Sequence, residues 1–328
     1  MAHGHDQMNQ LNMSNQEIGK TKIVLTALII SLTFLFLFFF FKGLDVEAYS
    51  HAPNYENVTV DTLLNVTNSA PEILLIVIND GNDIVLNAGR NTTVIANVTI
   101  RDWDNNYSAG YNDSIYVNGT FYYYLNQSTD PDDPNVHYTD ADCEYAGYID
   151  DYTGYYYCNF SVRYFANNGT WYVNVTVTDS YPTHKDNDYN TTTILPIYAL
   201  NVSTTVIDYG DVAVGETSNP QEVNVTNIGN MPINITVSGY GQTWGDGLAM
   251  VCDVGSLQIS DEEFSHNTTA FQPLVSGSWA LVPDTTIPKQ TQEGVLKIND
   301  TYWRITVPVA ENPHGICTGY VVFSAIAP

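Results

Sequence analysis

The chain has 328 residues, of which 36 are acidic and 10 are Lys or Arg, giving a net charge of -26. This charge repels phosphate backbones and argues against nucleic-acid binding, and the length is enough for about two ordinary domains. Only 14% of the residues are charged, and Tyr, Val, Ile and Thr are abundant, which favours strands over helices.

The first element along the chain is an uncharged apolar run from Ile23 to Phe41. As a helix it would extend about 28 Å, close to the thickness of a bilayer core of about 30 Å. Lys20 and Lys22 precede it, so the positive-inside rule places the N-terminus in the cytoplasm. We therefore predict a cytoplasmic tail at residues 1–22 and a single-pass anchor in the cell membrane, with the later domains outside the cell.

Two alternatives for this segment stay open. A small-x-small pattern ending at Ala48 is typical of a signal-peptide cleavage site, and cleavage there would release the remainder as a secreted protein. Processing between Gly19 and Lys20 would instead produce a pilin-type or archaellin-type subunit, whose apolar helix packs in a filament core. Residues 42–70, which are rich in Pro, Asn, Ser and Thr, are expected to form a stalk after the anchor.

The first folded domain is predicted at residues 71–180. In the segment 93–103, Val94, Ala96, Val98 and Ile100 alternate with mostly polar residues, which is the pattern of a half-buried strand. Turns rich in Gly and Asn separate similar runs, so we expect a β-sandwich or barrel. The other strands predicted in this domain are 73–80, 114–125, 155–165 and 170–178.

The second folded domain is predicted at residues 194–328, after a polar linker at residues 181–193. Two amphipathic strands come early in it, because Val223 and Val225 alternate with polar residues, as do Ile233 and Ile235. Later strands are predicted at 294–298, 301–309 and 319–325. The predicted fold class is therefore all-β, with two sandwich domains in tandem after one N-terminal transmembrane helix.

A family resemblance enters at the start of the second domain. Asp208-Tyr209-Gly210-Asp211-Val212-Ala213-Val214-Gly215, followed by a strand and Asn227-Ile228-Gly229-Asn230-Met231-Pro232, resembles the opening of immunoglobulin-like modules of the ASH/major-sperm-protein type. The first domain, with paired cysteines and a final strand NNGTWYVNVTVTD, resembles Ig-like repeats of archaeal surface proteins. The resemblance implies a surface-layer or adhesion protein, and it implies no ligand or catalytic residue.

The cysteines are Cys143, Cys158, Cys252 and Cys317, with two in each predicted domain. Pairing within each domain predicts the disulfides Cys143–Cys158 and Cys252–Cys317, which suit an oxidising compartment outside the cytoplasm. Free buried thiols remain the alternative. The sequence has no Cys-x-x-Cys pair and its histidines are scattered, so we expect no metal site built on cysteine and histidine.

Asn-x-Ser/Thr tripeptides are frequent after the apolar run, and they are potential acceptors of N-linked glycans. Because residues i and i+2 of a strand share a face, pairs such as Asn234 and Thr236 are expected on the outward face. The alternative is that the polar face of a strand is simply rich in Asn and Thr, which produces the same tripeptides by alternation without any glycan. The candidate acceptors are Asn57, Asn65, Asn91, Asn97, Asn118, Asn159, Asn174, Asn201, Asn224, Asn234 and Asn299.

The loop closed by Cys143 and Cys158 combines acidic and aromatic residues. Its tyrosines offer apolar area with one polar group, so a recognition surface is predicted at Tyr145, Tyr148, Tyr152 and Tyr155, with ordinary sheet packing as the alternative. The acidic residues between Asp140 and Asp151 do not have EF-hand spacing. A solvated acidic loop is favoured there, calcium is the alternative, and no other cofactor is expected.

No motif of a Ser hydrolase, zinc protease or nucleotide-binding loop occurs in the sequence. We therefore expect no catalytic residues and no enzyme. The predicted function is a membrane-anchored extracellular structural or adhesion protein, whose partners are the membrane itself, other copies of the chain, surface glycans or other surface proteins. The alternatives are the filament subunit described above and a secreted carbohydrate-binding or hydrolytic module.

Overall fold

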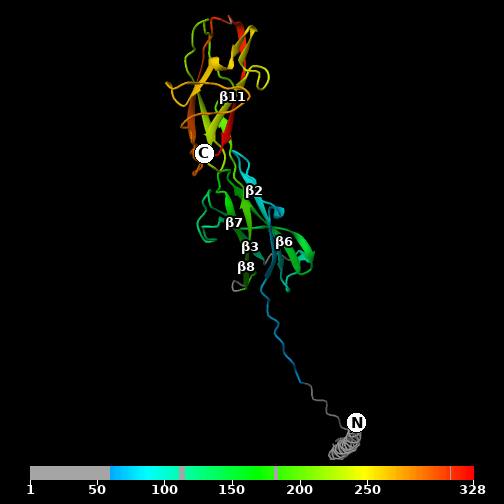
Figure 1. Cartoon of the computed structure of the whole chain (residues 1–328). Helices are drawn as coiled ribbons and strands as arrows, with labels where there is room; N and C mark the ends of the chain where they lie inside the picture. Colours follow the sequence, from blue (N-terminus) through cyan, green and yellow to red (C-terminus); the bar gives the residue numbers. More distant parts are fainter. Residues whose placement is uncertain (1–59, 111–114, 181–183, 311) are drawn as a thin grey trace, which may run out of the picture. The chain divides into compact units, whose positions relative to one another are not determined.

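The computed structural model describes residues 60–110, 115–180, 184–310 and 312–328 (Figure 1). The chain divides into two units, Met1–Asn65 and Val66–Pro328. The predicted tail, the predicted anchor at 23–41 and most of the predicted stalk lie outside the described residues. Across the described ranges, no helix is long and apolar enough to span a bilayer. The regular elements of Val66–Pro328 are strands and three-residue 3-10 turns, which confirms the all-β prediction.

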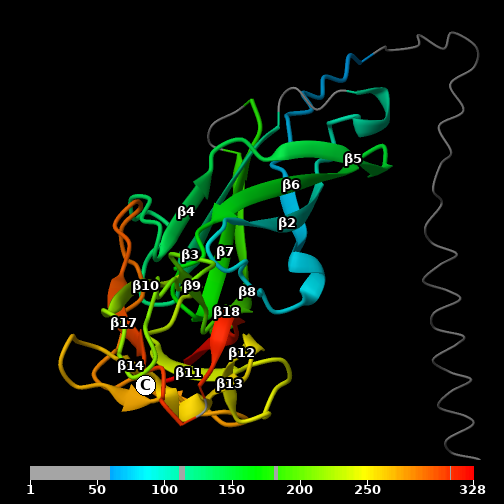
Figure 2. The same ribbon diagram turned by 90° about the horizontal axis from the view of Figure 1, so that it is seen from above.

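The first sandwich contains a sheet in which every neighbouring pair of strands is antiparallel. Its order is β1 (Glu72–Ile78), β2 (Thr92–Arg101), β6 (Thr153–Val162) and β5 (Glu144–Asp150). Figure 2 shows β2, β5 and β6 side by side in this layer. In β2, Val94, Ala96, Val98 and Ile100 are fully buried and the residues between them are not. The predicted alternation is confirmed because one face of the sheet covers the core.

The second sheet of the first sandwich completes this core. Its order is β4 (His137–Asp140), β3 (Tyr116–Tyr123), β7 (Gly169–Thr178) and β8 (Lys185–Ile194). Trp171 of β7 lies 4.6 Å from Phe121 of β3 between ring centroids, and Phe121 lies 5.5 Å from Phe160 of the opposite sheet. The Trp171 indole N–H donates to the Asn167 carbonyl at 2.7 Å, so its one polar group is satisfied although the ring is buried.

The second sandwich is built from a five-stranded and a three-stranded sheet, with a further three-stranded sheet beside them. The five-stranded order is β15 (Gln272–Pro273), β14 (Glu262–Ser265), β17 (Ile298–Ile305), β10 (Gln221–Asn227) and β9 (Leu200–Val202). The facing sheet is β16 (Ala280–Leu281), β11 (Asn234–Tyr240) and β19 (Tyr320–Ile326). The third is β13 (Ser256–Gln258), β12 (Leu248–Val254) and β18 (His314–Thr318). Trp303, Phe264, Val225 and Ile235 form the centre of the main core.

The predicted linker at residues 181–193 is wrong, because most of it belongs to β8. This strand pairs with β7 along its whole length, from Gly169↔Ile194 to Thr178↔Lys185. Its sequence KDNDYNTTTI lacks apolar alternation because β8 is an edge strand with one side chain, that of Ile194, fully in the core. Backbone hydrogen bonds to β7 hold β8 in the sheet, so apolar periodicity could not reveal this strand. The first sandwich therefore extends to Ile194.

The two strands predicted at 294–298 and 301–309 are replaced by one. The observed strand is β17, Ile298–Ile305, and it pairs with both β10 and β14. Gly294 has a positive φ of 76°, which belongs to a turn and leaves no strand before Ile298. Asn299 and Asp300 lie inside β17, so the polar pair that suggested a break is part of the ladder.

Candidate functional site

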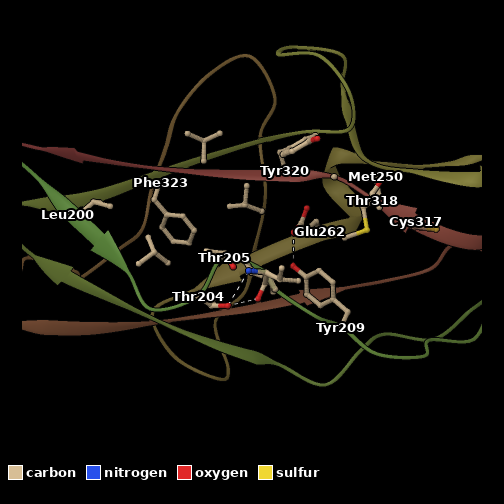
Figure 3. A pocket seen from close by; sticks show the side chains of 16 residues that line it. Leu200, Thr204, Thr205, Tyr209, Met250, Glu262, Cys317, Thr318, Tyr320 and Phe323 are labelled. Carbon is tan, nitrogen blue, oxygen red and sulfur yellow. Dashed lines mark hydrogen bonds between the residues drawn. The ribbon is translucent and has the colours of Figure 1, made fainter.

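The second sandwich has an open side between two edge strands. In the described part of the chain β9 pairs with β10 and β19 pairs with β11, and neither has a partner on its other edge. A groove of about 770 Å³ lies between them (Figure 3), within the range of about 300–1,000 Å³ of ordinary ligand pockets. The connection at residues 204–209 and the side chains of Met250 and Glu262 complete its walls.

The floor of this groove is the apolar core of the sandwich. Leu200 and Val202 of β9, Tyr209, and Val321 and Phe323 of β19 all pack against the core and also line the groove. Each is half-buried rather than buried, because no further strand covers it. Apolar side chains held at an open groove favour burial by an apolar occupant.

One carboxyl group points into this apolar wall. Glu262 is 2% exposed, and the Tyr209 hydroxyl donates to its Oε1 at 2.6 Å, a contact that Figure 3 draws as a dashed line. Burial raises the pKa of Glu262 to about 7, and burial together with the adjacent Glu262 raises the pKa of Tyr209. Among the described residues lining the groove Glu262 is the only acid, so the groove lacks the carboxylate pair of glycoside hydrolysis.

An aromatic strip runs from the mouth of the groove over the surface of the second sandwich. Tyr320 stacks on Tyr240 at 5.0 Å between centroids, Tyr240 meets Trp244 at 6.2 Å, and Trp244 meets Trp279 at 5.4 Å. Tyr320, Trp244 and Trp279 are 58%, 48% and 48% exposed. Exposed rings of this kind offer flat apolar area for contact with a sugar or a protein. The sequence did not predict this strip, because its members are distant along the chain.

A carboxylate fixes the loop that carries Trp244. Asp246 accepts backbone N–H groups of Gln242 at 2.7 Å and Thr243 at 3.0 Å, and also those of Gly241 and Leu248. These hydrogen bonds, led by those of Gln242 and Thr243, hold the pKa of Asp246 well below its usual range. The loop is therefore ordered by its own acidic residue, and Trp244 is presented on a fixed backbone.

The four tyrosines predicted as a recognition surface in the first sandwich differ in their exposure. Tyr148 and Tyr152 are 51% and 43% exposed, as expected. Tyr145 is half-buried and stacks on the buried ring of Tyr107 at 6.0 Å, so it supports the core. Burial and, after it, Tyr148 and Tyr155 raise the pKa of Tyr145, and Tyr155 is itself half-buried. Tyr152 also lies 5.6 Å from Trp103 between ring centroids, and Trp103 is an exposed residue outside the predicted set.

The candidate glycan acceptors differ in accessibility. Asn57 lies outside the described residues. Among the others, Asn65, Asn91, Asn118, Asn159 and Asn201 are exposed, while Asn97, Asn174, Asn224, Asn234 and Asn299 are half-buried. The Asn174 amide exchanges hydrogen bonds with Asn187, and that of Asn224 donates to Asp300 at 2.8 Å. The exposed group is therefore the better set of acceptors.

One expected outward residue is buried. Thr236 is 6% exposed, and its hydroxyl donates to the Ser324 carbonyl at 3.3 Å. The expectation failed because β11 is the central strand of its sheet and both of its faces are covered, as the neighbouring Ser238 also shows by donating to the Val275 carbonyl. Alternation alone does not reveal a strand that is buried on both faces.

Three acidic residues of the candidate calcium loop accept hydrogen bonds from nearby backbone or hydroxyl groups. Asp140 accepts the N–H of Asn159 at 2.7 Å, and Asp150 accepts that of Tyr152 at 2.9 Å. Asp151 accepts the Ser108 hydroxyl at 2.5 Å. Within the described ranges, no group of three or more His, Cys, Asp or Glu residues is placed to hold a metal ion. Calcium at Asp140–Asp151 therefore stays an untested alternative.

Both predicted disulfides are confirmed, and they occupy different positions. Cys143–Cys158 lies in the core, where a Cβ on Gly119 of the opposite sheet would meet the Cys158 sulfur at 3.0 Å. This close approach explains why glycine interrupts β3. Cys252–Cys317 joins directly paired residues of β12 and β18, and Cys317 lines the groove.

Comparisons with known proteins identify no family. No protein-family model and no curated protein matches the chain. The chain is similar to the secreted serine protease VesC of Vibrio cholerae with 11% identity and a TM-score of 0.19, covering 74% of this chain and 48% of that one, about half its length. It is also similar to the C-terminal domain of the Streptococcus agalactiae AgI/II polypeptide BspA, with 9% identity and a TM-score of 0.22, covering 79% and 96% of the two chains.

Proposed function

We propose that the chain is a membrane-anchored structural or adhesion protein that presents two Ig-like β-sandwich modules outside the cell. The observation that carries this proposal is that each sandwich has its own disulfide. Disulfides persist in oxidising compartments, which the chain reaches by crossing a membrane, and the apolar run at residues 23–41 supplies the means. The archaeal surface-layer resemblance points to the same class of protein.

Adhesion in this proposal uses the aromatic strip on the second sandwich. Tyr240, Trp244, Trp279 and Tyr320 form a continuous ring surface that is broader than the pair Trp103 and Tyr152 of the first sandwich. Aromatic residues are enriched at contact surfaces because they bury large apolar areas with little loss of conformational freedom. The same strip also favours the carbohydrate-binding alternative.

Protease shaving of intact cells tests the location. We expect an external protease to release fragments of residues 66–328, while a cytoplasmic marker stays intact. Full protection of the chain until the cells are lysed would end the proposal.

Cell–cell adhesion tests the role of the strip. The double variant Trp244→Ala with Trp279→Ala is expected to weaken adhesion. The control Trp103→Ala, at an even more exposed Trp on the other sandwich, is expected to leave it unchanged. Binding of the purified chain on a glycan array would assign the strip to carbohydrate. Equal adhesion by all variants would remove the strip from the proposal.

A further inference from the structure

Residues 60–66, just before the first sandwich, carry an unusual amount of exposed apolar surface. Val60, Leu63, Leu64 and Val66 are 75%, 99%, 82% and 82% exposed, and the segment has no regular structure. Single exposed apolar residues are common, but four large ones in seven positions mark a contact surface or a risk of aggregation. We call this stretch the donor segment.

The groove between β9 and β19 has the complementary properties. It opens onto half-buried apolar side chains, including Val202, Val321 and Phe323, that a further strand would cover. Its two flanking strands each have a backbone edge without a partner in the described chain. An unpaired edge beside an apolar floor is the arrangement that accepts an extended peptide as an added strand.

We propose that the groove receives the donor segment of a second copy of the chain as an additional β-strand. Extended over residues 60–66, the segment places Val60, Leu64 and Val66 on one face, because side chains two apart share a side of a strand. At about 3.3 Å per residue these seven residues span roughly 20 Å end to end, which matches the seven consecutive residues from Cys317 to Phe323 that line the groove.

Charge also fits this pairing. The chain has a net charge of -26, so most of its surface repels another copy. The donor segment contains one acidic residue, Asp61, and no basic one. The groove contains one acid, Glu262, which is buried and bonded to Tyr209. Both partners are thus locally poor in charge, and their contact avoids the general repulsion.

A second copy is the fitting occupant because every copy presents both an exposed apolar segment and an open apolar groove. The apolar side chains of the donor segment are exposed to water, while the groove is open. Every copy carries both a donor segment and a groove, so a contact that is not exchanged reciprocally between two copies leaves a free donor segment and a free groove. Such pairing propagates into a filament and requires no packing of residues 23–41 between copies. This inference goes beyond the proposed function and does not depend on where the protein resides.

Photo-cross-linking of the purified full chain tests the pairing. A benzophenone amino acid replaces Leu64 in natural-abundance chains, which are mixed with ¹⁵N-labelled chains and irradiated. We expect mixed-isotope adducts on residues 200–209 and 318–323, mapped by mass spectrometry. The same probe at Val85, a 64% exposed residue of the first sandwich, should give none there. Adducts within single chains only, or adducts that avoid the groove, would overturn the proposal.

Two variants test the pairing separately, one in the donor segment and one in the groove. Leu64→Asp with Val66→Asp places charge in the donor segment, and Thr205→Trp fills the groove from an exposed position. Each is expected to lower the mixed-isotope cross-link yield or the self-association constant at least tenfold, while Val85→Asp leaves both unchanged. For the donor-segment variant, the benzophenone is placed at Val60. Unchanged association in both variants, with intact disulfides and an unchanged circular dichroism spectrum, would contradict the pairing.

Discussion

The two sandwiches differ at their facing edge strands, which are joined by side-chain hydrogen bonds in the first and separated by a groove in the second. In the first, edge strands β1 and β8 face one another, and polar side chains join them: Asp186 accepts the Ile73 N–H at 2.7 Å, and Asn190 donates to the Ile76 carbonyl at 2.7 Å. In the second, β9 and β19 face one another across the groove, and the sequence of β19, YVVFSAI, contains no acidic, basic or amide side chain to reach across.

This contrast shows that polar residues on an edge strand can close a sandwich as well as keep it soluble. A hollow of about 530 Å³ remains beside β1 and β8, but Asn190 lines it and reaches across to β1. The unpaired backbone groups of the first sandwich are thereby partly satisfied by its own side chains. In the second sandwich they stay available to another chain.

The largest expected effects come from the two buried tryptophans. Trp171→Ala and Trp303→Ala should each lower the free energy of unfolding by about 3–5 kcal/mol. Trp171 is enclosed by rings that include Phe121 and Tyr123, whereas Trp303 contacts the half-buried Phe323 beside the groove, where the structure can collapse more easily. Trp171→Ala should therefore lower the free energy of unfolding, measured by urea denaturation, more than Trp303→Ala does. A larger loss in Trp303→Ala would show that side chains beside the groove do not relax into the cavity.

Removal of the disulfides gives the next largest effects. The Cys143–Cys158 loop spans 15 residues and the Cys252–Cys317 loop spans 65. Chain entropy predicts losses of about 3 and about 4 kcal/mol for the paired Cys→Ala variants. Urea denaturation of the two double variants checks this ranking. A larger loss at Cys143 and Cys158 would show that burial in the core outweighs loop length.

Glu262 gives the second sandwich a pH dependence that Glu262→Gln should remove. Its folded pKa of about 7 lies above the ordinary 4.5, so its contribution to stability is complete below about pH 4.5 and is lost as the pH rises through 7. The full loss corresponds to at most about 3 kcal/mol. We expect Glu262→Gln to be more stable than the natural chain at pH 8 and to differ little at pH 4. Parallel stability curves for both chains across this range would contradict the assignment.

The side-chain hydrogen bonds between β1 and β8 give the smallest expected losses of stability. Asp186→Ala and Asn190→Ala should each cost about 1–2 kcal/mol, because each leaves a partly buried backbone group without its partner. Asp188→Ala, on the same strand but exposed and accepting the adjacent Tyr189 N–H, is the matched control. It should stay within about 0.5 kcal/mol of the natural chain in the same denaturation assay.

Strands with one buried face could be predicted from sequence, and strands without that asymmetry could not. β2 and β7 show the expected alternation because one side of each covers a core. β8 is polar on both sides and β11 is buried on both, so neither the strand at Lys185–Ile194 nor the burial of Thr236 follows from periodicity. The disulfides could be predicted because each pair lies within one sandwich.

The groove and the aromatic strip depend on strand order, which the sequence does not state. Leu200 and Phe323 are far apart along the chain, and they line one groove only because β9 and β19 occupy facing edges. Trp244 and Trp279 lie in connections whose approach is set by tertiary packing. By contrast, the Tyr-rich loop of the first sandwich attracted a functional prediction by its local density, although Tyr145 proves to support the core.

Hydrogen exchange at two protein concentrations tests the contrast between the two edges most directly. Amides of β19, Tyr320–Ile326, are compared with those of β8, Lys185–Ile194, in the same samples of the full chain. Raising the concentration should slow exchange in β19 and leave β8 unchanged, and Thr205→Trp should abolish the slowing. Exchange in β19 that is independent of concentration, or that slows equally with β8, would contradict an open edge that pairs with another copy.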